Sequence, residues 1–133
     1  MFQFRVRFPI SDGAVVLALK GALTSWTGLK VQPKLPDVMT KRVITVRNDS
    51  GPQELSRASR RYGINVWADN SVEAENLALD AMEGLTALAD GSPFLSVGSF
   101  TGPFEIPDSP AYTFGTTSMT HFYFAFQGTV KGS

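Results

Sequence analysis

The sequence predicts an α+β domain in which two helices pack on a mixed, mainly antiparallel sheet. A length of 133 residues corresponds to one domain, residues 1–133. Hydrophobic residues make up 43% of the chain and charged residues 18%, as in globular proteins. Strand-like segments follow one another directly in the middle and at the end, which favours antiparallel pairing. The expected order is strand, helix, strand, strand, helix, strand, strand.

The first strand and helix are expected within the opening residues. Residues 2–8 alternate Phe or Val with Gln or Arg, a pattern typical of a strand. This segment is also a candidate N-terminal arm, residues 1–10. Ser11 is a suitable cap for a helix over residues 12–23, which carries apolar residues along one side.

The middle of the chain predicts a loop and two long strands. Residues 24–40 are rich in Gly and Pro and are expected to form a mobile loop, with a short strand near residues 29–31. The β-branched run at residues 41–47 predicts a strand. Turn residues at 48–52 then lead to a further strand over residues 54–68.

The second helix has the clearest signals. Asn70 with Glu73 three residues later forms a capping pattern, and apolar residues follow at helical spacing as far as Leu88. Residues 90–93, Asp-Gly-Ser-Pro, should end this helix.

Two strands are expected to complete the sheet. The first covers residues 94–104, and a proline-rich loop follows at residues 103–110. The second covers residues 116–130 and alternates most regularly, so its phenylalanines should face the core while His121, Tyr123 and Gln127 face away. The predicted core therefore includes Val66, Leu77, Leu85, Phe122, Phe124 and Phe126.

Charge and composition exclude several classes of protein. Twelve basic and twelve acidic residues give zero net charge, which disfavours a strongly basic nucleic-acid binder. The absence of cysteine excludes disulfides, thiol nucleophiles and cysteine-ligated metals. No apolar run has the length of a membrane span, and the alternating start does not resemble a signal peptide. We therefore expect a protein made in the cytoplasm.

The sequence offers no catalytic, cofactor or metal site. His121 is the single histidine, and it is better explained as a surface or interface residue than as a ligand. No nucleophile-elbow, dinucleotide-binding or phosphate-loop pattern occurs. We expect a protein that is not an enzyme and that needs no cofactor.

Two charged groups are candidates for an interface or for the lining of a channel. The basic group is Arg57, Arg60 and Arg61, and the acidic group on the second helix is Glu73, Glu75, Asp80 and Glu83. The arginines are suited to a partner or to phosphates. An ordinary solvated sheet face explains them equally well.

The stretch from Arg42 to Val130 resembles the tail terminator proteins of long-tailed bacteriophages, also called tail completion or minor tail proteins. It is similar in particular to those of phages of actinobacteria. The most specific part is a strand ending in Val-Trp-Ala-Asp that leads into a capped Glu-Ala-Glu helix. The residues that carry the resemblance are YGINVWAD (62–69), SVEAENLA (71–78), LADG (88–91), Gly102-Pro103, Pro107-Asp108 and the last aromatic strand.

The resemblance implies a structural virion protein located at the neck of the tail. Such a protein forms a homohexameric ring on the last ring of the tail tube protein and stops tube growth. It then presents a surface to the head completion or stopper protein, and DNA passes through its lumen. Two alternatives stay open: another neck component such as a head-tail stopper, or a small cytosolic α+β enzyme or ligand-binding protein.

Overall fold

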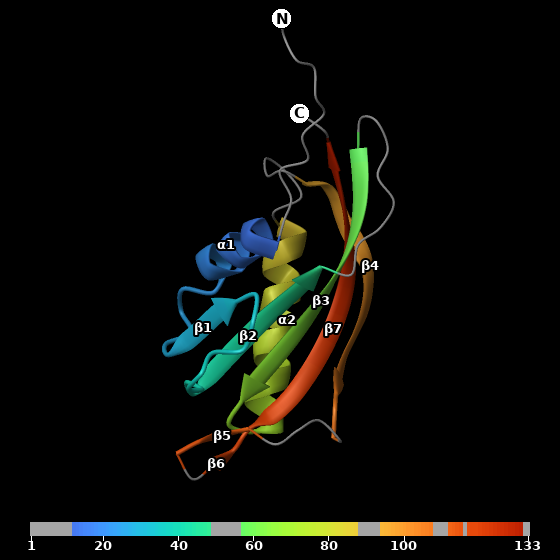
Figure 1. Ribbon diagram of the computed structural model, residues 1–133. Coiled ribbons are helices and arrows are strands. Elements are labelled where there is room, and N and C mark those ends of the chain that lie inside the picture. The colour runs from blue at the N-terminus through green and yellow to red at the C-terminus, as the bar shows by residue number, and fades with distance from the viewer. Residues whose placement is uncertain (1–11, 49–56, 88–93, 108–111, 116, 132–133) are drawn as a thin grey trace, which may run out of the picture.

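The structure, a computed structural model, describes residues 12–48, 57–87, 94–107, 112–115 and 117–131. This part of the chain forms two helices, one large sheet and one small hairpin (Figure 1). The elements are α1 (Asp12–Ala22), β1 (Leu29–Gln32), β2 (Arg42–Asn48), β3 (Arg57–Ala68), α2 (Ser71–Ala87), β4 (Phe94–Glu105), β5 (Thr113–Phe114), β6 (Thr117–Ser118) and β7 (Thr120–Lys131).

The large sheet has five strands in the order β1-β2-β3-β7-β4. β1 pairs with β2 in parallel, whereas the β2–β3, β3–β7 and β7–β4 pairs are antiparallel. The predicted α+β fold with a mainly antiparallel mixed sheet is therefore confirmed. β5 and β6 form a separate hairpin that precedes β7.

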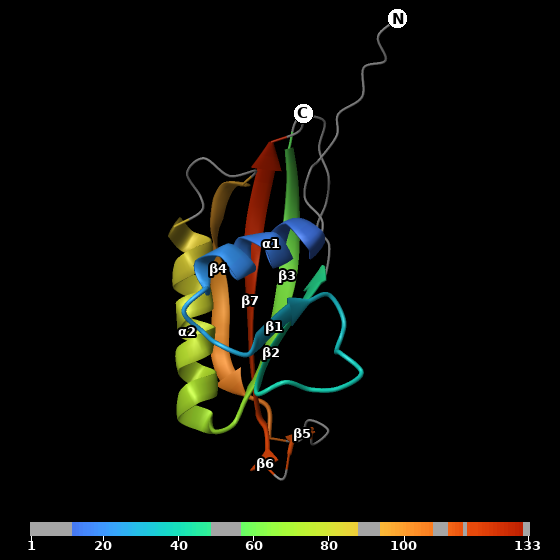
Figure 2. The same cartoon turned by 90° about the vertical axis from the view of Figure 1, so that its left-hand side faces the viewer.

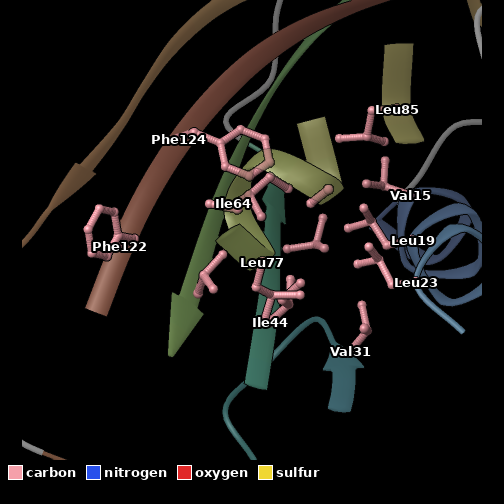
Figure 3. Close-up of a cluster of buried hydrophobic side chains, with 14 of the residues drawn as sticks. Val15, Leu19, Leu23, Val31, Ile44, Ile64, Leu77, Leu85, Phe122 and Phe124 are labelled. Carbon is pink, nitrogen blue, oxygen red and sulfur yellow. The ribbon is translucent and has the colours of Figure 1, made fainter. Parts of the chain in front are cut away.

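Both helices cover the same face of this sheet (Figure 2). The core lies between the helices and the sheet, and alternating residues of β3 and β7 reach it from the sheet side (Figure 3). The predicted core is confirmed, because all six of the expected side chains are buried in this cluster. They are Val66, Leu77, Leu85, Phe122, Phe124 and Phe126.

Local signals explain the start of α2 and its contact with α1. The amide of Glu73 donates to the side-chain oxygen of Asn70 over 2.8 Å, so Asn70 is the N-cap that the sequence predicts. Near the other end of α2, Gly84 faces the end of α1. A Cβ at Gly84 would lie only 2.6 Å from the Cβ of Ala22, so glycine lets the two helices approach closely.

The structure corrects two predicted boundaries. The loop predicted at residues 103–110 is wrong at its start, because β4 continues through Pro103 to Glu105. The strand predicted at 116–130 is divided at Met119 into β6 and β7. β1 lies within the predicted loop 24–40, where the short strand was expected.

Some of the predicted segments lie outside the described residues. They are the first strand and arm (residues 1–10), the cap at Ser11, the turn at 49–52, the start of the third strand at 54–56, the end of the second helix at 88–93, residues 108–110 of the proline-rich loop and residue 116 of the last strand.

Candidate interaction surfaces

The sheet face opposite the helices is the larger candidate surface. Tyr62, Ile64 and Val66 of β3 point into the core, so alternation directs Arg61 and Asn65 to the opposite face. No helix in the described part of the chain covers this side (Figure 2). We call it the open face, and its side chains include Arg47, Arg61, Asn65, Thr101, Phe104 and Tyr123.

One end of this side carries a second, smaller apolar cluster. Val43, Trp67 and Met119 are buried there, beneath half-buried side chains of the segment between β1 and β2 and of the residue before β5. These covering side chains are Leu35, Met39 and Tyr112. Other segments of the same chain therefore cover this end of the sheet, which we call the closed end.

His121 belongs to the border of this cluster. Its ring stacks on Trp67, with centroids 4.4 Å apart, and its Nε2 lies 2.7 Å from Oδ1 of Asn65. Burial lowers the pKa of His121 from its usual 6.5, because the charged imidazolium loses water. These contacts give His121 a packing role on the sheet.

Outside the closed end, the open face carries an aromatic pair next to the cluster and, further along the strands, cations. The rings of Phe104 and Tyr123 lie 5.9 Å apart on neighbouring strands, and Phe104 is 44% exposed. Arg61 donates from Nη2 to Oγ1 of Thr101 over 3.3 Å, which does not neutralise its charge. Arg47 is exposed on β2.

The rest of the predicted basic group is only partly placed. Backbone pairing sets Arg57 opposite Lys131 and Arg60 opposite Gly128, near one end of β3. The side chains of Arg57 and Arg60 lie outside the described part of the structure. Arg61 is therefore the member of the group whose side chain is placed.

Two of the four predicted acidic residues are engaged inside the chain. Glu73 forms an ion pair with Arg42, whose Nε lies 2.8 Å from Oε1. Arg42 also lies over the ring of Trp26, 5.1 Å from its centroid, and donates to the carbonyl of Thr27. Trp26 in turn donates from Nε1 to Asp80 over 2.9 Å. These contacts connect α2 to β2 and to the segment that follows α1.

The other two acidic residues, Glu75 and Glu83, are exposed on the outer side of α2. They lie beside two apolar residues that face solvent, Val72 at 68% and Leu79 at 46% exposed. Positions 72, 76, 79 and 83 share one helix face. We call this surface the outer stripe, consisting of Val72, Glu75, Asn76, Leu79 and Glu83.

The acidic residues of the outer stripe are among the residues predicted from the sequence, whereas its apolar residues Val72 and Leu79 are not. The signal was present, because Val72 and Leu79 are seven residues apart on the otherwise polar side of the helix.

The described residues contain no group of three or more His, Asp or Glu side chains placed to hold a metal ion. None of the helices in the same described ranges is long and apolar enough to cross a membrane. The chain matches no protein-family model and no curated protein.

Proposed function

We propose that this protein is a structural component of a bacteriophage tail, a tail terminator that caps the tail tube as a homohexameric ring. In this role it stops growth of the tube and offers the surface on which the head completion or stopper protein joins. DNA passes through the lumen of the ring. In this role the protein acts by contact with other chains rather than by catalysis.

The observation that carries this proposal is the one-sided covering of the sheet. Both helices pack on one face, and the opposite face keeps Phe104 and Arg47 exposed outside its closed end, with Arg61 and Tyr123 half-buried beside them. A surface of this kind is suited to contacts with other chains. The sequence resemblance supports the same function, and its most specific part corresponds to the junction of β3 with α2.

Size also supports an assembly. A domain of 133 residues has a radius of gyration of about 14 Å, so one copy cannot surround a DNA duplex. A channel therefore requires several copies, and closed cyclic rings are built from heterologous contacts.

The decisive experiment is electron microscopy of the purified protein mixed with tail tubes assembled from the tube protein of the same phage. We expect a ring with an open channel at one end of each tube, and tubes that no longer elongate. A ring that binds isolated head portals instead of tubes would favour the head-tail stopper. A monomer that ignores both and binds a small molecule would contradict the proposal.

A further inference from the structure

Two charged groups of opposite sign lie on opposite sides of the described structure. The open face carries Arg47 and Arg61, while the outer stripe of α2 carries Glu75 and Glu83. The sheet lies between these two surfaces, because α2 packs on the opposite face (Figure 2). The two groups therefore cannot meet within one copy of the chain.

We propose that the open face of one copy binds the outer stripe of α2 of a second copy. The contact is heterologous, since two different surfaces meet, and it repeats from copy to copy. It specifies how the subunits of the proposed ring touch, and in that sense it rests on the proposed function.

The two surfaces match in chemistry. Each combines apolar side chains with charges of one sign: Phe104 and Tyr123 accompany the arginines, and Val72 and Leu79 accompany the glutamates. Pairing them covers exposed apolar area and places opposite charges across the interface. Pairing two copies of the same surface would instead bring like charges together.

The two surfaces also match in length. A helix rises about 1.5 Å per residue, so Val72 and Glu83 are about 16 Å apart along α2. Tyr123 is paired with Asn65 on β3, and Arg61 lies four residues from Asn65. At about 3.3 Å per strand residue this separation is roughly 13 Å. A helix laid along the strands can therefore place Val72 on the aromatic rings and Glu83 near Arg61.

The other two acidic residues of α2, Glu73 and Asp80, make contacts within their own chain and are not part of the outer stripe. Glu73 and Asp80 are held by Arg42 and Trp26, so they fix α2 on its own subunit. Glu75 and Glu83 are exposed on the outer stripe, where a neighbouring copy can reach them.

The test uses charge reversal of the full-length protein in two variants, Arg61→Glu and Glu83→Lys. Either variant alone brings like charges together at every contact, so we expect self-association to weaken about tenfold or more, measured by analytical ultracentrifugation at low salt. The double variant in one chain should recover association.

Mixing the two single variants gives a sharper result. In an alternating assembly, the reversed open face of the Arg61→Glu protein meets the reversed stripe of the Glu83→Lys protein. The remaining contacts join an unchanged open face to an unchanged stripe, so the mixture should associate although neither variant does alone. Lys20→Glu and Asp37→Lys are matched controls, because they reverse charges of the same signs at exposed positions outside both surfaces. Circular dichroism should show that all variants are folded.

The proposal is overturned if the single variants associate like the native protein, or if the mixture and the double variant fail to recover. Loss of DNA binding by Arg61→Glu with unchanged association would assign the open face to the channel instead. Rings that form and cap tubes in every variant would refute this interface and leave the proposed function standing. Native protein that never caps tubes would refute the proposed function.

Discussion

The close approach of the two helices allows a sharp test of the fold through Gly84→Ala. In an exposed helix interior, replacing glycine by alanine stabilises a protein by up to about 1 kcal/mol. Here the new Cβ would lie 2.6 Å from the Cβ of Ala22, against about 3.5–4.0 Å for an ordinary carbon contact. Overpacking of this kind costs about 1–3 kcal/mol. We therefore expect a net loss of about 1 kcal/mol in the free energy of unfolding.

The clash has one defined partner, so it can be removed by a second substitution. In an Ala22→Gly background the opposing Cβ is absent, and Gly84→Ala should then be neutral or stabilising. The coupling between the two sites should be about 1–3 kcal/mol. Urea unfolding followed by the fluorescence of Trp26 and Trp67 measures all four variants of this cycle.

Gly21→Ala is the matched control. A Cβ at Gly21, in α1, meets no atom within 4 Å, so this substitution should stabilise the protein or leave its stability unchanged. If Gly84→Ala raised stability equally in the native and Ala22→Gly backgrounds, the close crossing of α1 and α2 would be refuted.

Three further predictions concern the core, the helix cap and the histidine. Phe124 is fully buried, so Phe124→Ala should lower the free energy of unfolding by about 3–5 kcal/mol in chemical denaturation; a loss below about 1 kcal/mol would contradict the packing of β7. Asn70→Ala removes the acceptor for the Glu73 amide and should cost about 1 kcal/mol, whereas Asn70→Asp should retain most of the stability. The lowered pKa of His121 means that the unfolded chain binds more protons between that pKa and about 6.5. The contribution of neutral His121 to the free energy of unfolding is therefore fully present above about pH 6.5 and is lost as the pH falls through this window. Replacing this residue in His121→Gln should reduce the dependence of the free energy of unfolding on pH. An equal slope in both proteins would show that other groups cause it.

The core of the fold could be predicted because its signals are local. The alternation of residues 122–126 and the cap at Asn70 depend on neighbours in the sequence and on burial of one face. Pro103 falls both in the predicted strand 94–104 and in the predicted loop 103–110, because proline usually ends a strand, and the structure places it within β4. It is tolerated here since β4 lies at the edge of the sheet, where the register shifts between Thr101 and Phe104.

The candidate surfaces were predictable only in part. Clustering in the sequence identified the charged residues, but the engagement of Glu73 depends on Arg42, 31 residues away. Only the folded chain shows which acidic residues are held internally and which stay exposed. The position of Arg61 on the face opposite α2 likewise follows from the packing of α2, which no local pattern fixes.

The edges of the sheet give a physical reason to expect that copies meet through faces. Two sheets join edge to edge when each presents a long regular strand with unpaired backbone groups. Here β1 has four residues, and β4 carries several register shifts as well as Pro103, which lacks an N–H donor. Within the described residues, neither edge therefore offers a continuous row of backbone donors and acceptors. The open face and the outer stripe offer apolar area and opposite charges instead, so an assembly of this chain should depend on salt. Association that is insensitive to salt would argue for a contact through other surfaces.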